Sequence, residues 1–88
     1  QYALGMQMAT FDGFLAANPE ERPFILSRSG FFGSSRYAAI WAGDNLSNYF
    51  YLANSIPCAL GLSISGQPFN GMDVGGFGND VSDALMLD

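Results

Sequence analysis

The stretch that decides the fold is Tyr37-Ala38-Ala39-Ile40-Trp41-Ala42-Gly43-Asp44-Asn45, in which an apolar run passes directly into a glycine and two polar residues. The run at 37–41 lacks alternation of polar and apolar residues, which is typical of a strand buried on both faces of a parallel sheet. The glycine and polar residues at 43–45 end the strand. Apolar side chains in the following segment, 46–62, recur on broad helical faces, so we expect a strand followed by a helix.

Two further strands are predicted on either side of this unit. Phe24-Ile25-Leu26 is a short apolar run that ends at Ser27-Arg28-Ser29, and Pro68-Phe69-Asn70-Gly71-Met72 is a second run followed by Asp73. Apolar strands that alternate with helices imply an α/β architecture with a parallel sheet. The link between the first two strands is short for a parallel crossover, so a hairpin at residues 29–37 remains an alternative.

The helices are predicted from periodicity and from the residues that end them. Residues 1–17 show an apolar face with a helical period and end at Asn18-Pro19; the face consists of Leu4, Met8, Phe11 and Leu15. We expect Pro57 to kink or restart the helix at 46–62. A last helix, capped by Asn79 or Asp80, is expected to run through Asp88.

The composition excludes several classes of protein. The chain has 88 residues with a net charge of −5, three basic residues, 49% hydrophobic residues and no histidine. It is too apolar for a disordered tail, and it has no apolar run of about 18 residues that would span a membrane. The negative charge argues against a nucleic-acid partner. With Cys58 as the only cysteine, no zinc site of cysteine and histidine ligands can form, and no metal is expected.

The low proportion of charged residues, 12%, indicates that the apolar surface needs a cover. About 25–35% is a sensible proportion for the surface of a small soluble domain. We therefore expect these residues to be a piece of a larger core, or an obligate partner in one.

Polar residues follow each predicted strand. The carboxyl ends of the strands in a parallel α/β barrel lie on one face, where the chemistry takes place. We therefore expect one site that contains Arg28, Asp44 and Asp73 and is framed by Trp41, Phe31 and Phe77. Carboxylates accept hydrogen bonds from hydroxyl groups and aromatic faces pack on sugars, so such a site suits a neutral polyhydroxylated ligand. Glycoside hydrolysis commonly uses two carboxyl groups.

Structural roles for the same residues remain open from spacing alone. Asp44 is also a candidate N-cap, Arg28 a candidate ion-pair partner and Asp73 a candidate turn former. Trp41 and Phe77 are candidate core residues. The glycine-rich segment 71–78 lacks the P-loop lysine and the spacing of a dinucleotide-binding loop, so we do not interpret it as a phosphate site.

Three blocks of the chain carry a specific resemblance. They are Arg22-Pro23-Phe24-Ile25-Leu26-Ser27-Arg28-Ser29-Gly30-Phe31, then Gly33-Ser34-Ser35-Arg36-Tyr37-Ala38-Ala39-Ile40-Trp41-Ala42-Gly43-Asp44-Asn45, then Gly66-Gln67-Pro68-Phe69-Asn70-Gly71-Met72-Asp73-Val74-Gly75-Gly76-Phe77. Together they closely resemble glycoside hydrolase family 31, the α-glucosidase family, in order and in spacing. The resemblance covers nearly the whole chain.

The resemblance implies that residues 1–88 are a fragment of a (β/α)8 catalytic barrel domain, with about three parallel strands, roughly the fifth to seventh, and flanking helices. Members of the family are retaining hydrolases that use two Asp residues and no cofactor is expected. Asp44 matches the general acid/base. Residues that match the pocket for the non-reducing-end sugar are Arg28, Trp41, Asp73 and Phe77. The nucleophile Asp of the family belongs to a motif outside these residues, so the remainder of the barrel is needed.

The function implied by the resemblance is hydrolysis of terminal non-reducing α-linked glucose from oligosaccharides. By themselves the 88 residues are expected to be inactive. A catalytically inactive fragment and a non-catalytic sugar-binding relative are alternatives, as are α-xylosidase, α-galactosidase and sulfosugar hydrolase activities within the family. Departures from the family pattern at Ala42, Tyr49-Phe50 and Met72 bear on pocket shape and leaving-group preference.

Overall fold

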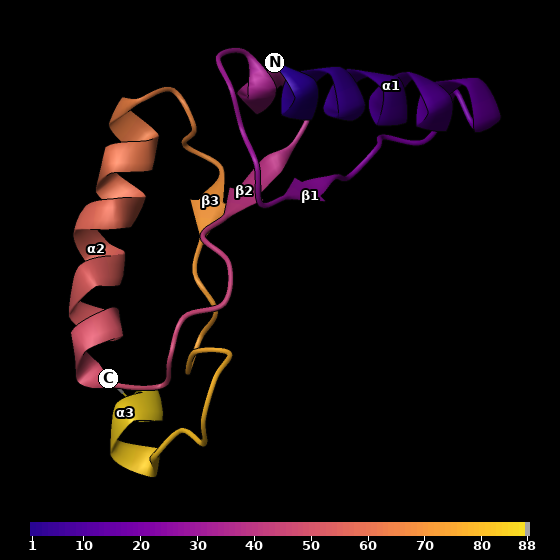
Figure 1. Cartoon of the computed structure of the whole chain (residues 1–88). Helices are drawn as coiled ribbons and strands as arrows, with labels where there is room; N and C mark the ends of the chain where they lie inside the picture. Colours follow the sequence, from indigo (N-terminus) through magenta and orange to yellow (C-terminus); the bar gives the residue numbers. More distant parts are fainter. Residues whose placement is uncertain (88) are drawn as a thin grey trace.

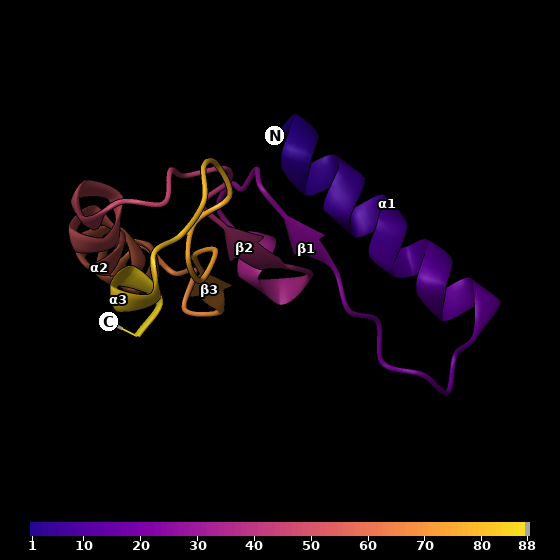
Figure 2. The same ribbon diagram turned by 90° about the horizontal axis from the view of Figure 1, so that it is seen from below.

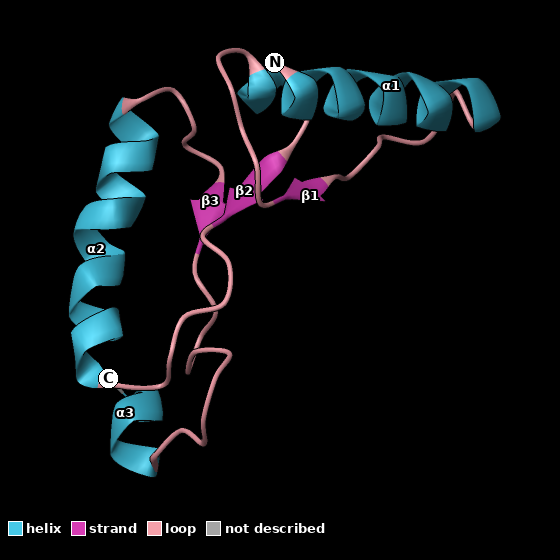
Figure 3. Cartoon of the chain, in the orientation of Figure 1, coloured by secondary structure: helices cyan, strands magenta, loops and turns pink. Residues whose placement is uncertain are grey.

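The computed structural model describes residues 1–87, which form three helices, one short 3-10 turn and a three-stranded sheet (Figures 1 and 3). In chain order the elements are α1 (Tyr2–Ala17), β1 (Leu26–Ser27), η1 (Ser34–Arg36), β2 (Ala39–Trp41), α2 (Tyr49–Ile64), β3 (Asn70–Gly71) and α3 (Asp83–Leu87).

The sheet is parallel and its strands follow the order of the chain, β1-β2-β3. Leu26 pairs with Ala39, and Trp41 pairs with Gly71. Both views in Figures 1 and 2 place the sheet between α1 and α2. The α/β prediction is confirmed, and the alternative of a hairpin between the first two strands is wrong.

The crossover fits because β2 begins at Ala39, later than the predicted start at Tyr37, which leaves residues 28–38 for the connection. The turn η1 compacts this connection around Ser34, which is fully buried. The Ser34 Oγ accepts a hydrogen bond from the Phe31 N–H at 2.9 Å, and the Ser34 carbonyl accepts one from the Ala38 N–H at 3.0 Å. One buried serine therefore closes the loop from both sides.

The outer strands are shorter than predicted. The predicted strand at 24–26 is found at Leu26–Ser27, and the one at 68–72 is found at Asn70–Gly71. Each of these strands pairs only with β2 among the described residues. The residue before each strand still bonds to β2: the Ile25 carbonyl accepts a hydrogen bond from the Ala39 N–H at 2.8 Å, and the Phe69 carbonyl accepts one from the Ile40 N–H at 3.0 Å.

The start of α2 differs from the prediction because a different residue caps it. The Asn48 Oδ1 accepts a hydrogen bond from the Tyr51 N–H at 2.9 Å, which satisfies one of the free amides of the first turn. The helix therefore begins at Tyr49 rather than at residue 46, and Asp44 is not its N-cap. The helix then continues through Pro57 to Ile64 without restarting.

The cap of the last helix was also predicted at the wrong residue. The Ser82 Oγ accepts a hydrogen bond from the Leu85 N–H at 3.2 Å, so Ser82 occupies the capping position of α3, and neither Asn79 nor Asp80 does. Asn79 instead has a φ of +67°, a left-handed conformation that belongs to a turn. The predicted end of this helix at Asp88 lies outside the described residues.

The two faces of the sheet have different surroundings. The buried Ile40 side chain lies against Gly30, and the Asn70 Nδ2 donates to the Ser63 Oγ of α2 at 3.1 Å, so this face meets the helical layer. Side chains alternate across a strand, and the pairing register places Leu26 and Trp41 on the opposite face. Leu26 is 54% exposed there. This second face is the one that carries the site.

Many apolar side chains, including those of α2, are more exposed than they would be in a complete domain. Among residues 1–87, the buried hydrophobic side chains are Ala38, Ala39, Ile40 and Leu85, and no residue of α2 is buried. In the part of the chain described, no helix combines the length and apolarity required to cross a bilayer.

Candidate active site

A cleft of about 450 Å³ lies on the face of the sheet that carries Leu26, and it collects four of the six residues that the sequence predicts to form or frame the site. Trp41, Asp44, Asp73 and Phe77 all line it. The strand register explains why: Trp41 is level with Gly71, and each carboxylate comes shortly after one of these paired positions. Both Asp residues therefore follow the carboxyl ends of adjacent parallel strands, where the catalytic groups of α/β barrels lie.

Aromatic rings form much of the wall of this cleft. Phe24 and Phe69 line it with their ring centroids 6.1 Å apart, and they are 67% and 63% exposed. Sequence reasoning missed these two residues as cleft residues because both belong to runs that predict buried strands. Side chains alternate along β3, so Phe69 lies on the same face as Gly71. This alternation could have predicted Phe69 as a cleft residue. Phe77, 69% exposed, completes an open aromatic wall.

Phe31 was expected to frame the site, and this prediction is wrong. Phe31 does not line the cleft, and its ring lies edge-on to that of Phe32 with centroids 6.1 Å apart. Its carbonyl accepts a hydrogen bond from the Gln67 Nε2 at 3.2 Å. The compact turn around Ser34 carries Phe31 away from the carboxyl end of β1.

Asp44 is exposed and lies in the loop between β2 and α2. The residue before it, Gly43, is buried and has a φ of +90°. A Cβ atom at Gly43 would lie 2.5 Å from the Arg28 Nε, so the guanidinium packs directly on the Gly43 backbone. The sequence therefore requires glycine here for two reasons, the left-handed φ and the close approach of Arg28.

Arg28 does not line the cleft itself. It lines a neighbouring hollow between α1 and β1 together with Gln7, whose Nε2 donates to the Ser29 carbonyl at 2.7 Å. Within residues 1–87 the guanidinium has no ion-pair partner, so the described part of the chain does not support the ion-pair interpretation. Its place against Gly43 brings it next to the backbone that carries Asp44.

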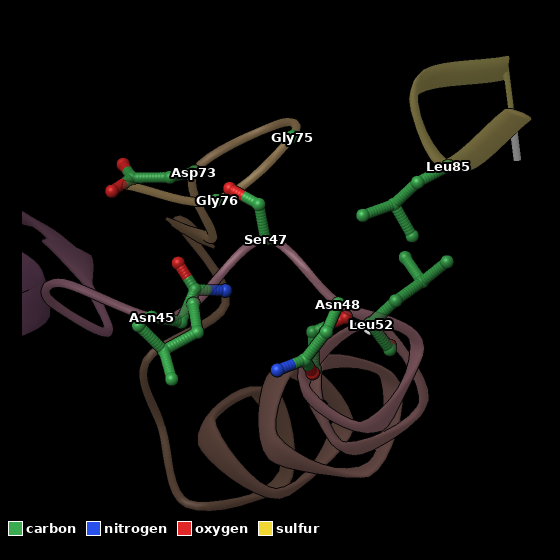
Figure 4. A pocket seen from close by; sticks show the side chains of 10 residues that line it. Asn45, Ser47, Asn48, Leu52, Asp73, Gly75, Gly76 and Leu85 are labelled. Carbon is green, nitrogen blue, oxygen red and sulfur yellow. Dashed lines mark hydrogen bonds between the residues drawn. The ribbon is translucent and has the colours of Figure 1, made fainter. Parts of the chain in front are cut away.

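The backbone and the side chain of Asp73 have different surroundings. Its carbonyl accepts a hydrogen bond from the Gly76 N–H at 3.2 Å, which closes a turn, so the turn-forming interpretation is confirmed for the backbone. Figure 4 shows its carboxylate directed away from Ser47 and Leu85. Because that carboxylate has no hydrogen bond to any described residue and lines the cleft, it is free to accept hydrogen bonds from a ligand.

The loops that follow β2 and β3 are joined beyond the strands. The Asn45 carbonyl accepts hydrogen bonds from the Phe77 N–H at 2.8 Å and the Gly78 N–H at 3.0 Å, and Leu46 forms an isolated parallel bridge with Gly78. Beneath this junction lies a small cavity of about 40 Å³ (Figure 4). Leu52 of α2 and Leu85 of α3 point toward each other at its edge. Sequence reasoning did not predict this junction.

No metal-binding group was found in the described part of the chain, since residues 1–87 contain no group of three or more His, Cys, Asp or Glu side chains that could hold an ion. The groups that the described residues place at or beside the cleft are carboxylate oxygens, aromatic rings and, beside the Asp44 loop, one guanidinium.

Parallel strands flanked by helices, with carboxylates just after the carboxyl ends of adjacent strands, define part of an α/β barrel. Residues 1–87 match the family model for the glycosyl hydrolases family 31 TIM-barrel domain, and the chain belongs to this family. The fold and the family expected from the three sequence blocks are both confirmed.

Several relatives of the chain are named as α-glucosidases. Neutral alpha-glucosidase C of Mus musculus is 49% identical over 87 residues, which cover 97% of this chain and 10% of that protein. Glucosidase 2 subunit alpha of Saccharomyces cerevisiae is 42% identical, with 97% of this chain and 9% of that protein covered. A crystal structure of glucosidase II alpha subunit superimposes with a TM-score of 0.89 and 43% identity over 96% of this chain and 9% of that one. The chain thus spans about a tenth of the length of these relatives.

Proposed function

We propose that this chain is part of a retaining α-glucosidase, which releases terminal non-reducing α-linked glucose from oligosaccharides. The observation that carries the proposal is the shared cleft at the carboxyl end of the sheet, in which Asp44 and Asp73 stand among Trp41 and Phe77. Glycoside hydrolysis commonly uses two carboxyl groups, of which Asp44 would supply one, and Asp73 and the aromatic walls suit the binding of a sugar. The names of the relatives, which include neutral alpha-glucosidase C, favour glucose as the sugar.

Asp44 is proposed as the general acid/base. In the first step a carboxylate nucleophile, supplied from outside these residues, attacks the anomeric carbon while the bond to the glycosidic oxygen breaks. Protonated Asp44 gives its proton to that oxygen, so the aglycone leaves as a neutral alcohol. A glycosyl ester of inverted configuration remains on the nucleophile. The retaining mechanism requires the two carboxyl groups to lie about 5–5.5 Å apart.

The second step uses the same carboxyl group as a base. Ionised Asp44 takes a proton from water, and the oxygen of that water attacks the anomeric carbon as the ester bond breaks. A second inversion restores the α configuration, releases the nucleophile as a carboxylate and leaves Asp44 protonated for the next cycle. The exposure of Asp44 at the mouth of the cleft suits this role, because both the aglycone and the incoming water must reach it.

The other cleft residues are proposed to bind the sugar. The Asp73 carboxylate has no partner among residues 1–87 and would accept hydrogen bonds from sugar hydroxyl groups. Trp41 and Phe77 offer ring faces to the C–H faces of the sugar, which expels water and strengthens the polar contacts. Arg28, packed on Gly43, is proposed to orient the Asp44 loop and to complete the sugar pocket.

Replacement of Asp44 in the complete enzyme tests the assignment. We expect Asp44→Ala to reduce kcat/KM for maltose by a factor of about 10²–10⁴, the usual contribution of general acid catalysis. Asp12→Ala, which removes an exposed carboxylate from α1, is the matched control and should leave turnover unchanged. Near-normal hydrolysis of maltose by Asp44→Ala would show that another group supplies the proton.

A further inference from the structure

We propose that the junction between residues 45–47 and 76–79 is the device that positions Asp44 for proton transfer, with Ser47 and Gly76 as its positioning residues. This inference rests on the proposed role of Asp44. It goes beyond that role because it assigns a task to Ser47 and Gly76, which do not line the cleft.

Ser47 ties the loop after β2 to the loop after β3 through both its side chain and its backbone. Its Oγ donates to the Gly78 carbonyl at 2.8 Å and lies 3.0 Å from the Asn79 carbonyl, and its N–H donates to the Gly78 carbonyl at 2.9 Å. Since Phe77 belongs to the second loop, these bonds fix the Asp44 segment relative to the aromatic wall of the cleft.

Gly76 allows the two loops to approach. It has a φ of +78°, and a Cβ atom on it would lie 2.9 Å from the backbone of both Leu46 and Ser47. These neighbours are backbone atoms, which cannot move away by a change of side-chain rotamer. The neighbouring glycine differs in this respect, because a Cβ at Gly75 would first meet the flexible end of Met86. A side chain at 76 therefore has to separate the loops.

The position of Asp44 depends on these contacts because its own side chain makes no hydrogen bond or ion pair with the described residues. Its backbone is held before the residue by Gly43, which lies under the Arg28 guanidinium, and after it by the Asn45 carbonyl, which accepts two N–H groups. Proton transfer requires heavy atoms within about 2.6–3.2 Å, so a small shift of the carboxyl group is enough to impair it. Loosening the junction should therefore impair proton transfer as well as the contact of Phe77 with the sugar, and only the loss of proton transfer depends on the leaving group of the substrate.

Substrates that differ in their leaving groups test this inference in the complete enzyme. Methyl α-glucoside needs a proton on its leaving oxygen, whereas α-glucosyl fluoride loses fluoride without general acid catalysis. We expect Ser47→Ala and Gly76→Ala to reduce kcat/KM for methyl α-glucoside about tenfold more than kcat/KM for the fluoride, as a small misplacement of a catalytic group would. Ser47→Thr, which keeps the hydroxyl group, should restore the normal ratio.

Gly33→Ala is the matched control for Gly76→Ala. Gly33 has a φ of +90°, and nothing lies within 4 Å of the place where its Cβ would be, so it introduces the same backbone strain without separating the loops. The ratio for this variant should equal that of the parent enzyme. If Ser47→Ala reduces kcat/KM equally for both substrates, the inference is wrong and the junction is only a structural contact. If Gly76→Ala does not fold, the Ser47→Ala result alone tests the inference. If Asp44→Ala itself shows no preference for the fluoride, the proposed function fails independently.

Discussion

Gly43 precedes Asp44 in a buried position and with a left-handed φ, and the Arg28 guanidinium lies on it. At the scale of single residues, the backbone before Asp44 is thus held at a position that admits no side chain. The carboxylates themselves are left without partners within residues 1–87. They are therefore available to a ligand, while glycines and carbonyl groups hold their backbone.

The contact between Gly43 and Arg28 predicts a specific loss on substitution. Gly43→Ala should destabilise the complete protein by about 1–2 kcal/mol through its positive φ and, in addition, displace Arg28 and reduce kcat by tenfold or more. Gly66→Ala is the control, since Gly66 has a φ of +93° with nothing within 4 Å of its missing Cβ. Chemical denaturation should show similar destabilisation for both variants, and kinetics should show loss of activity for Gly43→Ala alone. Full activity of Gly43→Ala would show that Arg28 does not orient the Asp44 loop.

The Asp73 carboxylate predicts a change in activity without a change in stability. Asp73→Asn should reduce kcat/KM for maltose by about 10- to 100-fold, because a hydrogen bond to a charged group contributes about 1.5–3 kcal/mol. The melting temperature should stay within experimental error, since the carboxylate has no hydrogen bond to the described residues. Asp80→Asn, an exposed acid outside the cleft, should change neither quantity. A marked fall in melting temperature for Asp73→Asn would assign the residue a structural role.

The sequence predicted the site best where a polar residue follows an apolar strand. Asp44 and Asp73 are of this kind, Trp41 is the last residue of β2, and all three line the cleft. Phe31 was misplaced because its position depends on a turn closed by the buried Ser34, and a single serine gives no periodic signal. The junction around Ser47 went unseen for a similar reason, since it consists of backbone hydrogen bonds between loops.

At the scale of the elements, the apolar pattern of α2 predicted that a helix forms but not where it begins. Its apolar faces predicted a helix, and the helix exists, yet its start was placed too early because Leu46 fits the helical pattern. Leu46 instead bridges to Gly78, and the Asn48 side chain sets the first turn. Several polar residues near the start of a helix can serve as its N-cap, and the tertiary contacts of the preceding loop determine which of them does. The parallel order of the strands was predictable, whereas their ends were not.

The cap of α2 gives a prediction for stability. Asn48→Ala should reduce the free energy of unfolding by about 1 kcal/mol, because it leaves the Tyr51 N–H without its acceptor. Asn54→Ala is the matched control: its Nδ2 donates to the Phe50 carbonyl from within the helix, and alanine is a better helix former there. Denaturant titration of the complete protein should show a loss only for Asn48→Ala. Equal stability of the two variants would mean that α2 is fixed by packing alone.

At the scale of the whole molecule, the described residues leave large apolar side chains open. Phe50 is 70% exposed on α2, and Phe24 is 67% exposed before β1. Exposed apolar surface of this extent marks an interaction site or a risk of aggregation. The relatives are about ten times longer than this chain, so the same segment lies within a much larger protein there. The composition alone had indicated that this surface needs a cover.

The exposed apolar faces predict the behaviour of the 88 residues on their own. A polypeptide limited to residues 1–88 should bind a hydrophobic dye, associate at micromolar concentration and show no turnover of α-glucosides. Dye fluorescence, light scattering and a glucose-release assay check these three expectations. Hydrolysis of maltose by the purified 88-residue polypeptide would contradict the expectation that the rest of the barrel is needed.

The most direct test of the central claim, that Asp44 is the acid/base of a retaining enzyme, is the configuration of the product that azide forms with the Asp44→Ala enzyme. Alanine leaves room for azide, which needs no general base and attacks the glycosyl ester on the face normally used by water. From α-glucosyl fluoride and azide, proton NMR should show α-glucosyl azide together with an increase in kcat of at least about tenfold. Formation of β-glucosyl azide would identify Asp44 as the nucleophile, and the absence of any azide product or rate increase would contradict its role as acid/base.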